Sequence, residues 1–239
     1  MIARAPGLLY TRPAMAKSRI IVPIVLTLLL SACGSGSITF NVAVDTAAGV
    51  DRQEMLGASL RMIERRVQAI EQQGGWQNLL EDSDLQADGD DTTITVKLAE
   101  SEAVDMLIED MTFPFSFEFM VQVPMEEAEI VVAETQGYRT VNLNASHVRQ
   151  LEDRLTGDGA EVLVEFTGEG ITRKTEVFTE HAGETMGLFV RGQPVYQFVV
   201  EAADTNSDSF IIKVPQAELA SVFADDVNAG LHVTFTPVQ

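Results

Sequence analysis

The chain has 239 residues, and its 36 Asp and Glu against 16 Lys and Arg give a formal net charge of −20 at pH 7. That charge repels nucleic acid and anionic lipid, so we exclude both as direct partners of the folded part. With one cysteine the chain can form no internal disulfide, so the fold has to depend on its hydrophobic core.

The N-terminal region has the layout of a bacterial secretory signal peptide. Lys17 and Arg19 precede an apolar run over residues 20–30, which small residues follow. The run is shorter than the about 20 residues that a membrane span needs, although an uncleaved anchor is an alternative. Met15 is an alternative start. Removal of residues 1–32 takes away four basic residues and no acidic one, which leaves a charge of −24.

The end of this leader resembles the lipobox of bacterial lipoproteins, with Leu30, Ser31, Ala32 and Cys33 at the cut site. The resemblance implies that Cys33 carries acyl chains such as palmitate and becomes the new N-terminus. Several acyl chains on one residue hold a protein at a membrane essentially permanently. We therefore expect a lipoprotein at the extracytoplasmic, periplasmic face of the cell envelope. Gly34 replaces the aspartate of inner-membrane lipoproteins, which favours the outer membrane and leaves both membranes open.

A first α+β unit is predicted over residues 38–125, after a Gly/Ser linker at 33–37. Alternating apolar residues indicate strands, and apolar spacings of three and four indicate amphipathic helices. The expected elements are strands at 38–44, 94–98 and 113–121 and helices at 51–73 and 101–108. Their order, strand, helix, strand, helix, strand, is of the ferredoxin-like kind.

A second α+β unit is predicted over residues 126–239. Ser146 is a candidate N-cap, and residues 191–194 read as a hairpin turn. The expected elements are helices at 146–155, 171–181 and 216–228 and strands at 162–166, 188–190, 195–200, 210–212 and 231–235.

The order and spacing of several motifs in this second unit resemble the first periplasmic domain of SecD, a membrane subunit that assists protein export through the Sec channel. The residues that carry the resemblance are Phe166, Glu169, Gly170, Thr179, Gly183, Gly192, Asn228 and Gly230. Arg61, Arg65 and Arg66 correspond to basic residues on the long helix of the family's base. The resemblance implies an α+β fold with two ferredoxin-like, split β-α-β subdomains, a base at 38–125 and a head at 126–239.

The same resemblance implies a function without catalysis. The chain is expected to be a membrane-anchored binding module that assists protein export or envelope protein handling, with exported polypeptides or Sec translocon components as partners. SecD carries a membrane domain after this region whose carboxylates serve proton-driven work, and we expect no proton coupling here. The alternatives are a structural or assembly lipoprotein whose partner is unrelated to the translocon, and a receptor for a small molecule or ion.

No catalytic residue, metal site or cofactor is predicted. His147, His181 and His232 fall in three different elements without metal-like spacing. Residues 84–95 depart from a calcium loop at Gln86 and Thr95, which favours a polar turn. The acidic residues 201–208 are expected at a solvated hairpin tip rather than at a weak cation site. Ser146 and Ser209 lack the context of a catalytic nucleophile.

Four phenylalanines alternate along one predicted strand, at Phe113, Phe115, Phe117 and Phe119. They share one face, so burial against the long helix at 51–73 explains them. The alternative is a peptide-binding groove, which needs exposed apolar surface at a sheet edge that accepts an extended chain.

Overall fold

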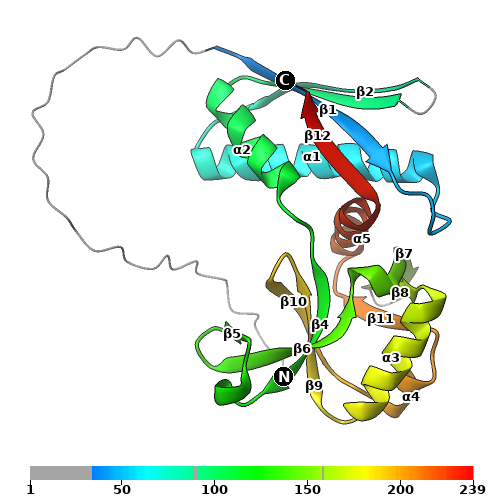
Figure 1. Cartoon of the computed structure of the whole chain (residues 1–239). Helices are drawn as coiled ribbons and strands as arrows, with labels where there is room; N and C mark the ends of the chain where they lie inside the picture. The colour runs from blue at the N-terminus through cyan, green and yellow to red at the C-terminus, as the bar shows by residue number, and fades with distance from the viewer. Residues whose placement is uncertain (1–33, 89–90, 158, 239) are drawn as a thin grey trace, which may run out of the picture. The chain divides into compact units, whose positions relative to one another are not determined.

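We describe a computed structural model of the chain over residues 34–88, 91–157 and 159–238 (Figure 1). The predicted signal peptide and lipobox, including Leu30, Ser31, Ala32 and Cys33, lie outside the described residues. The fold is α+β and contains three antiparallel sheets, in agreement with the fold class predicted from the sequence.

The first sheet has the strand order of a split β-α-β unit, β12-β1-β3-β2. Its strands are β1 (Gly36–Val44), β2 (Leu80–Asp88), β3 (Asp91–Leu98) and β12 (Val233–Val238). The helices α1 (Arg52–Gly74) and α2 (Ser101–Thr112) pack together against one face of this sheet (Figure 1).

The strand that completes this sheet differs from the expected one. The sequence predicts that the phenylalanine-rich strand closes the first unit, but β4 (Phe117–Val123) lies in a second sheet. The strand that closes the first sheet is β12 instead, whose residues pair antiparallel with β1 from Val44↔Val233 to Thr39↔Val238. Strand pairing therefore does not follow the predicted boundary at residue 125. Residues 117–123 pair in a five-stranded sheet, although the sequence predicts them in the first unit, and residues 233–238 pair in the first sheet, although the sequence predicts them in the second unit.

Two further sheets form the part of the fold between α2 and β12. The five-stranded sheet has the order β10-β9-β4-β6-β5, and the three-stranded sheet has the order β11-β8-β7. Their remaining strands are β5 (Ile130–Val132), β6 (Gln136–Asn144), β7 (Val148–Thr156), β8 (Gly159–Phe166), β9 (Thr185–Val190), β10 (Gln193–Val199) and β11 (Ser209–Val214). The helices are α3 (Gly168–Glu180), α4 (Ala202–Thr205) and α5 (Ala217–His232), with short 3₁₀ turns η1 (Met125–Glu127) and η2 (Ala145–His147).

Local sequence signals explain the long helix α1. The side chain of Asp51 accepts a hydrogen bond from the Glu54 amide and so caps the first turn. Gly75 ends the helix with φ 72°, a left-handed conformation that glycine adopts without strain. The predicted apolar stripe is buried against the first sheet, with Leu60 at its partly exposed margin.

The helix predicted at residues 146–155 is wrong. Only η2 is helical there, and residues 148–156 form the strand β7. A bulge between Val148 and Gln150 shifts the alternation by one residue, so that Val148 and Leu151 are both buried although they are three residues apart. That spacing imitates a helical pattern.

The polar turn predicted at residues 84–95 is also wrong over most of its length, where the chain forms strands. Residues 80–88 form β2, an edge strand that pairs with β3 through a continuous register from Asp82↔Lys97 to Asp88↔Asp91. Its acidic side chains lie on the exposed part of the strand, where charge discourages pairing with another chain.

The apolar residues gather into two main cores, one for the first sheet and one shared by the other two sheets. Helix α5 contributes to both, because Ala220, Ala224 and Val227 pack into the second core and Ala229 into the first. Within the described residues, no helix has the length and apolarity that crossing a membrane requires.

The four alternating phenylalanines do not behave as one set. Phe117 and Phe119 are fully buried, as the core interpretation predicts, but in the second core rather than against α1. Phe113 precedes the strand and is 55% exposed, and Phe115 is only partly buried.

Candidate functional site

The motif residues that carry the SecD resemblance occupy mostly structural positions. A Cβ atom on Gly170 would clash with the carbonyl oxygen of His147, and one on Gly230 would clash with the ring of Phe115. Gly183 and Gly192 have φ values of 82° and 73°. Phe166 is buried in the second core, whereas Glu169 and Thr179 are exposed on α3. The structure does not bring these residues together into one site.

Asn228 joins α5 to the three-stranded sheet. Its Oδ1 accepts a hydrogen bond of 2.7 Å from the Leu151 amide, and its Nδ2 donates one of 2.8 Å to the Leu151 carbonyl. The side chain therefore satisfies both backbone groups of a buried residue at the bulged end of β7. It lies inside α5, four residues before the helix ends.

The three histidines contact different residues and share no partner. His147 Nδ1 lies 3.0 Å from Asn144 Oδ1, and His181 Nδ1 lies 2.8 Å from Glu184 Oε2. His232 Nε2 lies 2.6 Å from the Arg149 carbonyl oxygen, and burial lowers the pKa of His232 below its ordinary value. Among the described residues, no group of three or more His, Cys, Asp or Glu is placed to hold a metal ion.

The acidic segment at residues 201–208 is not a hairpin tip, because β10 and β11 belong to different sheets and α4 lies between them. The fully buried side chain of Lys174 donates hydrogen bonds to the carbonyl oxygens of Asp204 and Ser207. Burial lowers the pKa of Lys174, and the nearby Asp204 and Asp208 partly oppose that shift. The cation at this segment is therefore the chain's own ammonium group.

A cavity with a mostly apolar lining lies between β10, β11 and α5, and we call it the β10–β11 groove. It measures about 620 Å³. Most of its lining residues are apolar: Phe115, Val190, Val195, Tyr196, Ile212, Val214, Pro215, Leu219, Val222, Phe223 and Val227, with Arg66, Arg191, Gln193, Lys213 and Asp226. Val195 and Leu219 are 45% and 48% exposed and both line this cavity, so exposed apolar surface gathers there and marks a candidate binding surface.

The two strands that border the groove are edge strands of different sheets. β10 ends the five-stranded sheet and β11 ends the three-stranded sheet. Near α4 their side chains pack together, with the rings of Phe198 and Phe210 4.5 Å apart. The groove is lined by the opposite halves of these strands, by Val195 of β10 and Val214 of β11, so it opens away from that aromatic contact.

The β9–β10 hairpin forms one wall and has the turn that the sequence predicts. Arg191 and Gly192 both have positive φ, 49° and 73°, as a two-residue turn between right-handed twisted strands requires. This conformation is sterically unfavourable for Arg191, and three contacts hold it. Its amide donates to Ser116, its guanidinium lies 3.0 Å from Asp110, and it also faces the ring of Phe113.

Charged side chains surround one end of the groove and link α1, α2 and α5. Their contacts are Arg61–Asp225 at 2.7 Å, Arg65–Asp226 at 2.6 Å, Arg66–Asp226 at 3.2 Å, Arg66–Asp110 at 3.4 Å and Arg191–Asp110 at 3.0 Å. We call these residues the ion cluster. The sequence indicates that the basic residues share a helix, but it gives no sign of their acidic partners on α5, which lie 160 or more positions away.

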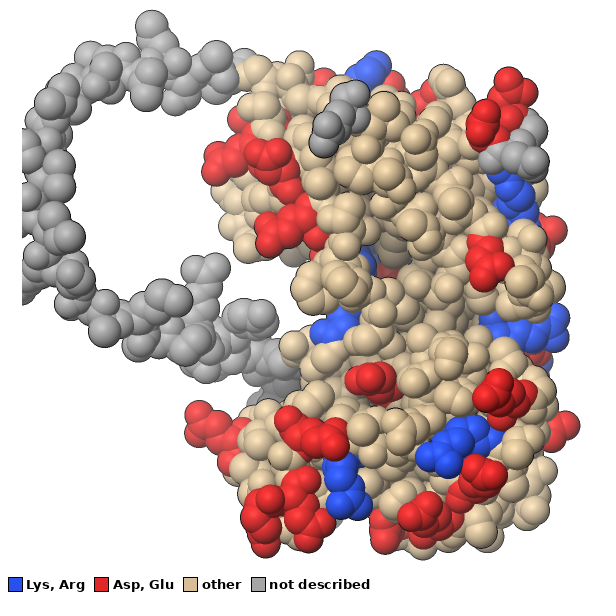
Figure 2. All heavy atoms as spheres, in the orientation of Figure 1, with Lys and Arg blue, Asp and Glu red and all other residues tan. Residues whose placement is uncertain are grey.

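The surface charge agrees with the spread of acidic residues along the sequence. On the face drawn in Figure 2, acidic side chains are distributed over the surface and basic ones are few. The groove is an exception, since its lining contains three basic residues and one acidic residue.

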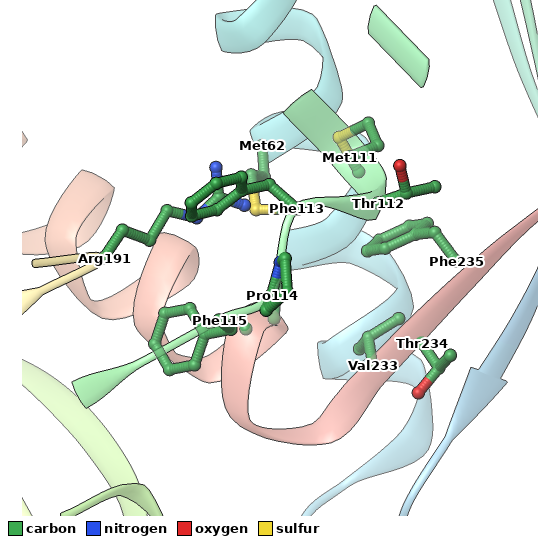
Figure 3. A pocket seen from close by; sticks show the side chains of 12 residues that line it. Met62, Met111, Thr112, Phe113, Pro114, Phe115, Arg191, Val233, Thr234 and Phe235 are labelled. Carbon is green, nitrogen blue, oxygen red and sulfur yellow. The ribbon is translucent and has the colours of Figure 1, made fainter. Parts of the chain in front are cut away.

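A smaller cavity of about 350 Å³ lies beside the groove, where the chain passes between the first sheet and the rest (Figure 3). Met62, Met111, Phe113, Phe235 and Arg191 are among its lining residues. Figure 3 shows the Arg191 side chain extending toward the Phe113 ring, whose centroid is 5.9 Å from the guanidinium carbon. This cavity shares Phe115 and Arg191 with the groove, and Arg191 is the one charged residue in its lining.

The geometry thus defines an α+β protein with a ferredoxin-like first sheet and an apolar groove between two sheet edges. Solved structures of similar fold include those of SecDF, and the sequence motifs resemble the SecD family. A SecDF structure from Thermus thermophilus is 17% identical, with a TM-score of 0.47, over 85% of this chain and 30% of that chain. A second, in a super-membrane-facing form, is 17% identical, with a TM-score of 0.44, over 86% and 30%.

A third similar structure is described as that of a membrane component, SecDF, that enhances protein export. It is 17% identical, with a TM-score of 0.44, over 85% of this chain and 98% of that chain. The chain thus spans about 30% of the length of the two longer SecDF chains. No family model matches the sequence, and no curated protein matches it. At this level the likeness concerns the fold alone.

Proposed function

We propose that the chain is a non-catalytic binding module that holds extended apolar segments of polypeptide in the β10–β11 groove. One observation supports this proposal above the others. The groove exposes apolar side chains beside two edge strands, and the outer sides of β10 and β11 pair with no other described strand. Edge strands with adjacent apolar pockets are a recurring way to bind extended peptides.

A polypeptide suits this groove better than a compact ligand. The lining combines residues of the two edge strands β10 and β11 with one side of α5, so a segment that lies along either strand can also contact the helix. The charged residues are gathered at one end and at Lys213, which leaves the middle of the groove apolar. Alternate side chains of an extended segment can be buried there, each gaining about 25 cal/mol per Å² of apolar surface removed from water.

We further propose that the bound segments belong to proteins being exported or handled in the cell envelope. The motif resemblance to SecD supports this partner class. A photoreactive amino acid at Val195 or Leu219 should crosslink to newly exported polypeptides or Sec components in cells. Phe210 is unsuitable for such labelling, because it is 4% exposed.

A matched control exists in the same sheet. Val131 of β5 is 49% exposed and lies at the opposite edge of the five-stranded sheet from Val195. The same photoreactive residue at Val131 should give few crosslinks. Equal labelling at both edges, or crosslinks at Val195 only to one folded envelope protein, would contradict the proposal, and the latter would favour an assembly role.

The lipid anchor at Cys33 is a separate proposal that rests on the lipobox-like sequence. Cells grown with labelled palmitate should yield a labelled protein, and Cys33→Ser should remove both the label and the membrane association. A wild-type chain that carries no label would refute the anchor without affecting the groove.

A further inference from the structure

The open edges of the three sheets differ in how they are protected against pairing with another chain. Natural edge strands are protected by charge, proline, bulges or short length. β2 and β7 carry several charged residues each, and β5 has three residues. β10 contains Pro194 and a bulge after it, and β12 contains Pro237. β11 has neither a proline nor a bulge, and Lys213 is the one charged residue among its six residues, which pair with β8 in an uninterrupted register.

The edge that only one charged residue, Lys213, protects is the one that borders the groove. Phe210 and Ile212 of β11 are buried, while Ile211 and Lys213 point to the opposite, exposed face. A strand added beside β11 would continue this alternation. Its inward side chains would then enter the groove, where Val195 of β10 and Leu219 of α5 expose apolar surface.

The charges around the groove favour a partner with negative charge. The lining contains Arg66, Arg191 and Lys213 against Asp226, in a chain whose net charge is −20. Arg66 and Arg191 are engaged in the ion cluster. Lys213 forms no ion pair within 4.0 Å of any described carboxylate, although Glu161 is its register partner on β8. A carboxylate on an added strand would lie beside Lys213, across from Glu161, on the exposed face.

We infer that β11 accepts an extended guest segment as an added β-strand, with apolar side chains at alternate positions facing the groove and an acidic residue beside Lys213. This inference rests on the proposed function and names the class of polypeptide that the groove takes. Main-chain hydrogen bonds to β11 supply affinity independent of sequence, and the alternate pockets and Lys213 supply selectivity. Segments with consecutive basic residues are disfavoured.

The first test uses fluorescent eight-residue peptides in which Val alternates with Thr, with one Glu on the polar face. Binding to the full chain is measured by anisotropy. Two variants of the peptide carry N-methyl groups on one or the other set of alternate amides. Only the amides on one side of a strand pair with β11, so one methylated isomer should bind about tenfold more weakly and the other almost normally, a difference of about 1.4 kcal/mol.

The outcomes separate the two proposals. Equal binding by the parent peptide and both methylated isomers would overturn strand addition and leave the groove as a binding site. A parent peptide that does not bind at all would overturn the proposed function as well. Laurate is an acyl chain without amides, so it cannot add to β11 as a strand. If laurate binds more tightly than the peptide, and amide exchange in β11 stays unchanged, strand addition is also overturned.

Amide exchange gives the second readout. Peptide binding should slow the exchange of alternate amides in residues 209–214 by at least about tenfold, as new hydrogen bonds protect them. The amides of β5 and β2 should be unaffected, because the guest does not reach those edges. Slowing that is equal at all edges would indicate a general increase in stability and would contradict the inference.

Charge reversal tests the role of Lys213. Lys213→Glu should weaken binding of the Glu-containing peptide several-fold and improve binding of the same peptide with Lys in place of Glu. Lys97→Glu is the matched control, since Lys97 is an exposed strand lysine of the first sheet. If both variants weaken the Glu peptide equally, the selectivity comes from net charge and not from Lys213.

Discussion

The first sheet and the two-sheet region between α2 and β12 use different kinds of core. Phe40 is the one aromatic side chain among the buried residues of the first core, as far as the described residues go, and the rest are aliphatic. The second core buries five phenylalanines, Phe117, Phe119, Phe166, Phe178 and Phe210. Its rings continue through Tyr196 and Phe198 to the margin of the groove.

This difference distinguishes a core that is covered by helices from a core that reaches the protein surface. The helices α1 and α2 cover the aliphatic core, and its sheet ends in an acidic strand and a proline-containing strand. The aromatic core reaches the surface between β10 and β11, which carry no acidic residue, although β10 also contains a proline. Large rigid rings can form a core and an exposed binding surface in one continuous layer, because each ring buries a large area at a small entropic cost.

The largest expected effect tests whether the two cores unfold separately. Phe119 is fully buried and contacts the rings of Phe166, Phe178, Phe198 and Phe210, so Phe119→Ala should destabilise the second core by about 4 kcal/mol. Residue-resolved amide exchange should show the loss in β4, β8 and β9. Equal loss in β1 and β3 would mean that the cores form one cooperative unit. Val131→Ala, at a side chain of β5 that is 49% exposed, is the control.

The next largest loss of stability is expected at one of two glycines in the first turn of α3. Gly170→Ala brings a methyl group against the His147 carbonyl, which is backbone and cannot turn away, so we expect a loss of about 2 to 3 kcal/mol. Gly168→Ala on the same turn has nothing within 4 Å of the new methyl group and should be nearly neutral. Urea unfolding of both variants measures the difference. A neutral Gly170→Ala would show that η2 can move away from α3.

The hydrogen bonds of Asn228 connect the helix shared by both cores to β7. Asn228→Ala leaves the buried amide and carbonyl of Leu151 without their partners, which should cost about 2 kcal/mol in urea unfolding. Asn228→Gln is the matched control, because it keeps the amide but moves it by one methylene. A loss below about 0.5 kcal/mol on Asn228→Ala would mean that water replaces the side chain.

The ion cluster should contribute less, and its contribution should depend on salt. Asp226 contacts Arg65 and Arg66 while about a quarter of its side chain is exposed, so Asp226→Asn should cost about 1 kcal/mol at low ionic strength. The cost should shrink as salt screens the charges. Asp82→Asn, which breaks the exposed pair with Lys97 in the first sheet, is the control. A cost that salt does not change would indicate a packing effect.

The smallest effect concerns pH. Burial lowers the pKa of His232 below 6.5, so the unfolded chain takes up a proton at higher pH than the folded chain does. Stability should therefore fall as the pH drops through and below about 6.5. His232→Gln keeps a donor for the Arg149 carbonyl but does not titrate, so its urea midpoint should fall less between about pH 7 and pH 5. An identical fall in both proteins would exclude His232 as the cause.

Elements with a clean period could be predicted from the sequence. The strands β1, β3, β8 and β11, the helices α1, α2, α3 and α5 and the β9–β10 hairpin lie close to the positions that the apolar pattern and turn residues indicate. Two of the errors concern edge strands, and the prediction also misses β5 and the interior strand β6. In β7 a bulge places two buried residues three positions apart, which imitates a helix. In β2 the acidic residues of an exposed edge strand imitate a polar turn.

The pairing of β12 with β1 could not be predicted from local patterns. Both strands alternate in the expected way, but nothing in either sequence indicates that residues nearly 200 positions apart are neighbours. The same limit applies to the groove. Val195 is exposed and Phe210 is buried although both belong to alternating strands, because exposure depends on how the edges of two sheets meet.

The place of β12 has a consequence for a chain that emerges from a ribosome or a membrane channel with its N-terminus first. β1 and α1 appear early, yet the edge of β1 that β12 covers stays open until residues 233–238 have followed. The region from β4 to β11 emerges in the interval and has all the strands of its own two sheets. The order of synthesis is therefore expected to complete the groove before the sheet that precedes it in the sequence.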